Sequence, residues 1–128
     1  GRAFLWTDAD GMIEIGLVEG TSPASGRGVN SDGWVVGTAG GVSAVPFLFD
    51  GTDSYRLQDL IVAGGDGWDL LNGTSNGAFS IADNGTIFGR GILNGELTAF
   101  AMVRPVPEPT ATFLFGLLSL GLLSRRRV

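Results

Sequence analysis

The sequence predicts a mainly β protein, made of four-stranded, propeller-blade-like repeats and followed by a single C-terminal hydrophobic helix. Three observations predict it: 22 of the 128 residues are glycine, the glycines separate short apolar runs, and one longer uncharged run lies near the C-terminus. Glycines between short apolar runs are typical of tight turns between short strands. The glycines show no Gly-X-Y period, which excludes collagen, and three tryptophans with many aliphatic residues indicate a folded chain.

Turns rich in Asp, Asn and Gly separate the apolar runs. Asn and Gly adopt the positive φ that two-residue hairpin turns require, so these segments predict hairpins. Residues 63–77 form the longest connection, where we expect a loop with one helical turn near Trp68–Leu71. In chain order, the expected strands cover residues 2–7, 12–18, 26–29, 34–38, 44–49, 55–62, 78–82, 86–90 and 97–103.

The pattern of strands and turns occurs more than once, which indicates an internal repeat. Gly28–Gly37 aligns with Ser80–Gly89 at an offset of 52 residues. The shorter pattern at Ala3–Trp6 is repeated at Pro46–Phe49 and at Ala99–Met102. The repeats predict two units and part of a third, over residues 1–43, 44–96 and 97–105.

The length of these units predicts how they are folded. Units of about 40 to 50 residues that hold four short strands are typical of propeller blades. A closed propeller needs at least about four blades, so two units and part of a third cannot close one. We therefore expect residues 1–105 to form a β-repeat region that is not closed.

Three features follow one another at the C-terminus. Pro107–Glu108–Pro109 comes first, the uncharged apolar residues 110–124 come second, and Arg125–Arg126–Arg127 comes third. A helix over 110–124 would be about 22 Å long, shorter than a hydrocarbon core of about 30 Å. That length is closer to the apolar region of a processed targeting signal than to a permanent transmembrane helix. Arginines are retained on the cytoplasmic side, so we expect residues 1–105 to lie outside the cytoplasm.

In this order the three features resemble a PEP-CTERM sorting signal over residues 106–128. Such signals end exported proteins of Gram-negative bacteria that make extracellular polymers. The resemblance implies that an exosortase, a transpeptidase-like membrane enzyme, recognises the Pro-Glu-Pro motif and removes the helix. The protein would then pass from the inner membrane to the cell envelope, surface or matrix. The alternative is a permanently membrane-anchored binding module whose helix is not cleaved.

The segment that the processing enzyme must recognise has a conformation that the sequence itself predicts. Pro107 and Pro109 fix their own φ and disfavour a helix at the residues before them. Glu108 is therefore expected in an extended, accessible peptide just before the membrane.

The repeats resemble the extracellular HAF repeat, through Ala3–Asp8 followed by Gly28–Gly37. These segments carry the patterns Ala-Phe-Leu-Trp-x-Asp and Gly-x-Asn-x-x-Gly-x-Val-Val-Gly. Arg2 stands where the histidine of that repeat would be, as does Thr98 in the last unit. The resemblance implies an extracytoplasmic β-repeat module with no established catalysis.

The composition excludes several classes of enzyme. The chain has no cysteine, histidine or lysine, so it has no disulfide and no means for thiol, His-assisted serine or Schiff-base catalysis. A carboxylate pair, as in glycosidases, is the route that remains. Because the carboxylates fall in turn-like positions, we expect no enzyme, and a carboxylate-dependent glycan-active fragment is the alternative.

The charge of the chain narrows its partners. Residues 1–105 carry five arginines against twelve carboxylates, a net charge of −7. Phosphates would be repelled, so nucleic acid is excluded as a partner. The expected partners are an exosortase, the membrane through the C-terminal helix, and extracellular polysaccharide, with no cofactor unless the acidic loops bind Ca²⁺.

Two acidic segments are candidate binding sites. Asp8, Asp10 and Glu14 could supply oxygens to Ca²⁺, but no EF-hand loop is present and a hairpin turn is the favoured explanation of Asp and Gly here. The other candidate is a ligand loop formed by Asp66, Trp68 and Asp69 in the longest connection. Trp68 is expected to be exposed there and able to stack on a sugar ring.

The other two tryptophans lie within apolar strands, so Trp6 and Trp34 are expected in the core. The chain begins at Gly1 without a charged-then-apolar leader, which an exported protein needs. We therefore expect a fragment or a mature form. The function that these observations favour is an exported surface or matrix protein with a structural or binding role.

Overall fold

The computed structural model describes residues 3–15, 24–40, 43–104 and 115–119, and it confirms a mainly β protein. Twelve strands and one short helix lie in these ranges. The elements are β1 Phe4–Thr7, β2 Gly11–Glu14, β3 Ala24–Val29, β4 Val35–Ala39, β5 Val45–Phe49, β6 Ser54–Arg56, α1 Leu57–Leu60, β7 Ile61–Ala63, β8 Trp68–Asp69, β9 Gly77–Ile81, β10 Ile87–Leu93, β11 Glu96–Val103 and β12 Phe115–Ser119.

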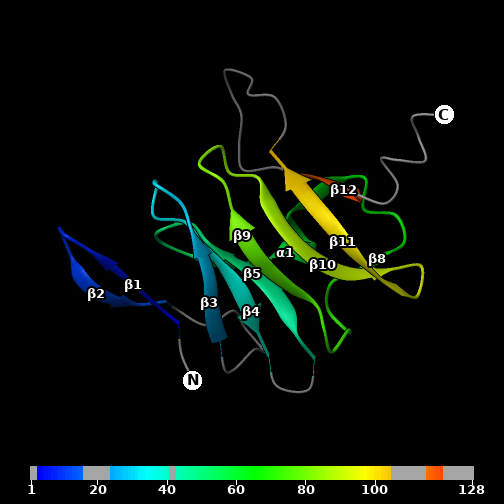
Figure 1. Ribbon diagram of the computed structural model, residues 1–128, viewed down its shortest axis with the longest axis horizontal. Helices are drawn as coiled ribbons and strands as arrows, with labels where there is room; N and C mark the ends of the chain where they lie inside the picture. Colours follow the sequence, from blue (N-terminus) through cyan, green and yellow to red (C-terminus); the bar gives the residue numbers. More distant parts are fainter. Residues whose placement is uncertain (1–2, 16–23, 41–42, 105–114, 120–128) are drawn as a thin grey trace.

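The strands form three sheets (Figure 1). β1 and β2 make a separate hairpin at one end of the molecule, and β3 to β6 make a four-stranded antiparallel sheet in sequence order. In the third sheet the order is β7-β12-β11-β10-β8, and β9 also pairs with β10. β9 packs against β3 and β4, so the two larger sheets lie side by side.

The repeated sequence segments adopt the same structure. β3, β4 and β5 form an antiparallel series, and the aligned strands β9, β10 and β11 form another. Even the register is equivalent, because Gly37 lies opposite Phe47 and Gly89 lies opposite Phe100. The sheet β3–β6 runs across residue 43, so the sheets and the sequence units differ in phase. No closed barrel or propeller is formed by the described residues.

Glycine is required at both of these register positions. A Cβ on Gly37 would overlap the carbonyl oxygen of Ser25 and lie 3.0 Å from Cε1 of Phe47. A Cβ on Gly89 would overlap the carbonyl oxygen of Gly77 and lie 2.7 Å from Cζ of Phe100. In each of the two larger sheets the phenylalanine ring therefore lies over the glycine backbone of the neighbouring strand.

Equivalent positions of the two units contact each other directly. The Asn30 side-chain amide donates to the carbonyl oxygen of Ala82 at 3.2 Å, and Ser31 N–H donates to Asp83 Oδ1 at 2.9 Å. Both pairs are 52 residues apart, the offset of the repeat. A Cβ on Gly28 would lie only 3.1 Å from Cα of Ser80, again its counterpart. The units are thus stacked in register, with turn against turn.

Two hydrophobic clusters form the core. The larger lies between the two larger sheets and includes the buried side chains of Val36, Leu48, Ile87 and Phe100. The smaller joins the first hairpin to the sheet β3–β6 through Ala3, Ile15, Val35, Ala39, Phe47 and Phe49. Each cluster depends on side chains that alternate along strands, since alternate residues of a strand share one face.

Several elements differ from the sequence-based expectation. The strand expected over 55–62 is divided into β6, the single turn α1 and β7. The helical turn expected near Trp68–Leu71 is instead the short strand β8 followed by a bend. β8 pairs with β10, and this long-range pairing has no local sequence pattern that could predict it.

The C-terminal helix expected over 110–124 is not what the structure shows for Phe115–Ser119. These five residues form β12, antiparallel to β11 and parallel to β7. The rest of 110–124 lies outside the described residues. Backbone N–H and C=O groups require a helix only where no other partner exists, as in hydrocarbon, whereas here two strand edges supply partners. In the part of the chain that the structure describes, no helix is long and apolar enough to cross a membrane.

Candidate functional site

The three tryptophans test the predicted binding surfaces. Trp34 is buried as expected, but the predictions for the other two were wrong. Trp68 is only 7% exposed and places its ring edge against Phe100, with centroids 5.9 Å apart and an interplanar angle of 85°. Trp6 is 60% exposed. The pairing of β8 with β10 draws Trp68 into the core, while the first hairpin leaves Trp6 at the surface.

The predicted ligand loop is held together by one of its own carboxylates. Asp69 accepts hydrogen bonds from the backbone N–H of Leu71 at 2.9 Å and of Asn72 at 3.1 Å, and from the Asn72 side-chain amide. The bond from Leu71 N–H, followed by that from the Asn72 side chain, lowers the pKa of Asp69 below its ordinary value. Asp66 is exposed in the preceding turn. With Trp68 buried, the loop presents carboxylates but no tryptophan ring, and a ligand role for Asp66 and Asp69 stays a prediction.

The predicted calcium ligands lie in the first hairpin. Asp8 and Asp10 are exposed in the turn between β1 and β2, where Asp10 N–H donates to Thr7 Oγ1 at 3.0 Å, and Glu14 ends β2. Over the described ranges, no three His, Cys, Asp or Glu side chains form a group that could hold a metal ion. The hairpin turn, the alternative weighed for these residues, is what the structure shows.

The turn that links the two units contains a carboxylate with a lowered pKa. Hydrogen bonds from the Ser31 backbone N–H and side chain lower the pKa of Asp83. Asn30 is buried, and its Oδ1 accepts from the N–H groups of Asp32 and Trp34, each at 3.0 Å. These bonds are structural, because they close the turn of one unit and fasten it to the next.

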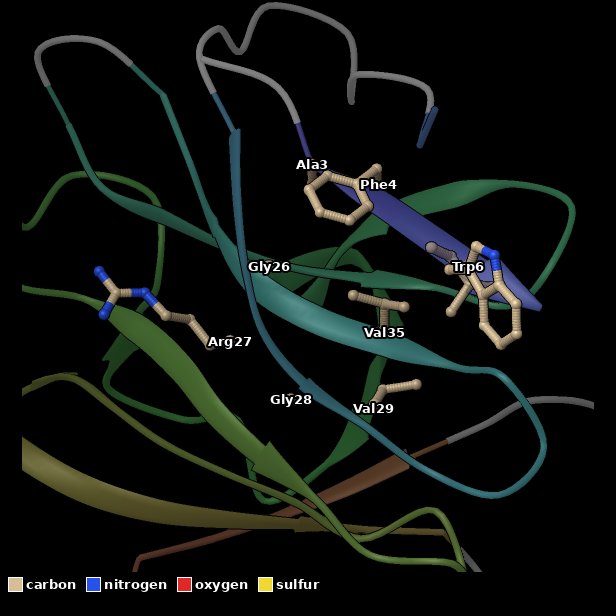
Figure 2. A pocket seen from close by; sticks show the side chains of 9 residues that line it. Ala3, Phe4, Trp6, Gly26, Arg27, Gly28, Val29 and Val35 are labelled. Atoms are coloured by element: carbon tan, nitrogen blue, oxygen red, sulfur yellow. The ribbon is translucent and has the colours of Figure 1, made fainter. Parts of the chain in front are cut away.

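A groove between β1 and β3 is the surface feature that the sequence did not reveal (Figure 2). It has a volume of about 410 Å³ and is lined mainly by apolar side chains. Phe4 and Trp6 project from β1 beside it, with Val29 and Val35 contributed by β3 and β4. Arg27 is the cationic residue of its lining, and its guanidinium extends away from the two rings.

The alternation of β1 contained a signal for this groove. Phe4 and Trp6 are two residues apart, so they share one face of the strand, and Leu5 faces the smaller core cluster. Phe4, Leu5 and Trp6 are three consecutive apolar residues, and such a run is typical of a strand that is covered on both faces. In β1 one face lacks a cover among the described residues, since Phe4 and Trp6 are exposed.

The predicted processing motif, Pro107, Glu108 and Pro109, lies outside the described residues, as do Arg125, Arg126 and Arg127. The structure does describe the chain just before the motif. Arg104 follows β11 and places its guanidinium carbon 5.2 Å from the ring centroid of Trp34. This cation–π contact fixes the end of the β-repeat region directly ahead of the motif.

Comparison with known protein families identifies this C-terminal segment. Residues 105–127 match the PEP-CTERM protein-sorting motif. No curated protein and no solved structure matches the chain. The motif marks an exported protein that is processed by an exosortase and sorted to the surface. The resemblance of the repeats to the HAF family stays a prediction.

Proposed function

We propose that this chain is a cell-surface or extracellular-matrix β-repeat protein with a structural or binding role, delivered there by exosortase sorting. The observation that carries the proposal is the sorting motif at residues 105–127. The net negative charge of the repeat region fits a protein that stays soluble outside the cell.

Sorting requires a change in the segment that contains β12. In the hydrocarbon core of a membrane every backbone N–H and C=O group must be bonded within the segment, so Phe115–Ser119 must become helical there. We propose that pairing with β11 and β7 represents the protein outside the bilayer, and that membrane insertion withdraws this strand. Arg125, Arg126 and Arg127 then hold the C-terminus on the cytoplasmic side.

The processing site follows the folded region at a short distance. The Arg104 contact with Trp34 is the last described contact before Pro107. Pro107 and Pro109 keep Glu108 out of any helix, so the enzyme meets an extended peptide between the folded repeats and the membrane. Polysaccharide remains a proposed partner of the mature protein, although the tryptophan expected to stack on sugars, Trp68, is buried.

The proposal is tested by expressing the chain, with an added export leader, in a Gram-negative host that has an exosortase. Mass spectrometry of the surface form should find no peptide that covers residues 113–123. The double variant Pro107→Ala, Pro109→Ala should keep that peptide and accumulate in the inner membrane, because the recognition segment can then become helical.

A matched control is Glu96→Gln, an exposed carboxylate at the start of β11, which should be processed like the wild type. If the surface form of the wild type retains residues 113–123, exosortase processing is wrong and the helix is a permanent anchor. If the chain never leaves the cytoplasm despite its leader, the proposed location is wrong as well.

A further inference from the structure

Equivalent residues of the repeat differ sharply in burial. Phe47 is 1% exposed and Phe100 is fully buried, whereas Phe4, which aligns with both, is 61% exposed. The same difference occurs two residues later in each strand, where Phe49 and Met102 are buried but Trp6 is exposed. The residue types are alike, so the difference comes from their neighbours. Ala3 and Ile15 pack with Phe47 and Phe49, and Trp68 packs on Phe100. In addition, β5 and β11 each have a neighbour on one edge that β1 lacks among the described residues.

That neighbour is a strand that carries glycine. β5 pairs with β4 and β11 pairs with β10, with Gly37 opposite Phe47 and Gly89 opposite Phe100. The phenylalanine ring covers the glycine in both pairs, as the 3.0 Å and 2.7 Å approaches of a hypothetical Cβ show. β1 is paired only with β2 within the described part of the chain, so Phe4 has no glycine beneath its ring.

Among the described residues, the free edge of β1 also has backbone groups without a strand partner. Ile15 N–H donates to the carbonyl oxygen of Ala3 at 2.9 Å, which makes Ala3 and Ile15 a hydrogen-bonded pair of the hairpin. Pairs alternate along an antiparallel ladder, so the N–H and C=O groups of Phe4 and Trp6 point away from β2. The corresponding edge of β5 is paired with β4, and the corresponding edge of β11 is paired with β10.

The opposite wall of the groove, formed by β3, also has an apolar side chain that is more exposed than its counterpart in the repeat. Ile81 on β9 is 7% exposed, and it belongs to the core cluster that contains Val36 and Leu48 of the neighbouring sheet. Val29 holds the equivalent position on β3 and is 57% exposed. The groove of about 410 Å³ between β1 and β3 thus lies where a preceding strand pair would cover Phe4, Trp6 and Val29 together.

We propose that the free edge of β1 is an addition site for one further β-strand of the same repeat. The incoming strand carries the pattern Asn-x-x-Gly-x-Val-Val-Gly and lies antiparallel to β1, with its last glycine opposite Phe4. This inference rests on the proposed structural role and names the partner of that role, a further repeat unit. Edge strands with exposed apolar residues readily accept a strand in this way.

A second copy of the chain fits the edge less well. Its two strands that carry the repeat glycine are already paired on both sides, β4 with Gly37 by β3 and β5, and β10 with Gly89 by β9 and β11. Two β1 edges set against each other would place side chains, not glycine, opposite Phe4. The incoming strand is therefore part of an additional strand pair. It is not a strand that already belongs to one of the sheets of a second copy.

The test adds such a strand pair to the whole chain. A copy of residues 24–43 is fused directly ahead of Gly1, which sets the copied Gly37 ten residues before Phe4, the separation of Gly37 from Phe47. Hydrogen exchange by NMR should slow by about tenfold or more at the amides of Phe4 and Trp6. A nuclear Overhauser effect should link the Phe4 ring to the Hα of the copied glycine.

The matched control carries Gly37→Val in the copied segment alone, where a side chain would meet the Phe4 ring. It should restore rapid exchange at Phe4 and Trp6 while the amide of Phe47 stays protected, which shows that the rest of the chain is folded. The proposal is overturned if the fusion leaves exchange at Phe4 and Trp6 unchanged, or if the control protects them equally. It is also overturned if the unmodified chain protects these amides in a concentration-dependent way, since the occupant is then a second copy. None of these readouts involves sorting, so they leave the sorting proposal unaffected.

Discussion

Ala3–Trp6 and Pro46–Phe49 are two copies of one sequence pattern in two different environments. In β5 the pattern is buried on both faces, between β4, β6 and the two core clusters. In β1 only one face is covered, and two aromatic rings remain at the surface. An apolar pattern therefore predicts a strand, whereas the neighbouring strands determine what that strand contributes to stability.

The largest expected effect comes from truncating the aligned phenylalanines. Phe47→Ala should lower the free energy of unfolding by about 3–5 kcal/mol, because it removes a buried ring and leaves a cavity. Phe4→Ala should change it by less than about 0.5 kcal/mol, because the ring is already exposed. Urea unfolding followed by circular dichroism measures both. Equal losses in the two variants would break the comparison.

The glycine beneath Phe47 provides the second test. Gly37→Ala should cost about 3 kcal/mol, because the new Cβ overlaps the Ser25 carbonyl oxygen and approaches the Phe47 ring. Gly26→Ala is the matched control on β3, since its Cβ would meet only ordinary contacts at 3.5 Å and 3.9 Å. Thermal unfolding should show a clear loss for the first and little change for the second. A tolerated Gly37→Ala would contradict the ring-over-glycine interpretation.

The turns of the two units can be compared in the same way. Asn30→Ala should cost about 2 kcal/mol, because it leaves the buried N–H of Trp34 without its acceptor and removes the link to Ala82. Asn84→Ala removes one part-buried bond to Thr86 N–H and no described link to the other unit, so it should cost less than about 1 kcal/mol. Denaturant midpoints measured for both variants show which one loses more stability. A larger loss in Asn84→Ala would show that the stacked turns do not hold the units together.

The smallest effect is the pH dependence of the link between Ser31 and Asp83. The pKa of Asp83 is lower in the folded protein than its ordinary value of 3.8, so the carboxylate stabilises the fold above about that pH. This contribution is lost as the pH falls through the folded pKa. The melting-temperature difference between wild type and Asp83→Asn should therefore be present at pH 7 and shrink below about pH 4. A difference that is constant over this range would rule out a charge-dependent link.

Much of the fold could be predicted because it depends on local chemistry. The Asn30–Gly33 and Asp83–Gly85 turns follow from side chains that bond their own backbone, as the Asn30 and Asn84 acceptors show. The alignment of Gly28–Gly37 with Ser80–Gly89 correctly anticipated strands that have equivalent partners and equivalent register. The predicted Trp34 core position also followed from its place in the apolar run Trp34–Val36.

The candidate sites were harder to predict because exposure is not a local property. Trp68 stands in a glycine-rich loop, yet the pairing of β8 with β10 buries it. Trp6 stands in an apolar strand, yet its hairpin ends the series of sheets and leaves it exposed. From the sequence, Asp69 was a candidate ligand. In the structure it stabilises its own loop by accepting hydrogen bonds from Leu71 and Asn72.

By itself, the sequence determined the turns, most of the strands and the sorting motif at residues 105–127, since each is written in consecutive residues. Only the tertiary structure decided which copy of the Phe-Leu pattern is covered and that Phe115–Ser119 pairs as a strand with β11 and β7. The physical reason is that turn geometry comes from neighbours along the chain. Burial and strand pairing instead come from neighbours in space, and these are 52 residues apart in the two hydrogen bonds that join the turns of the units.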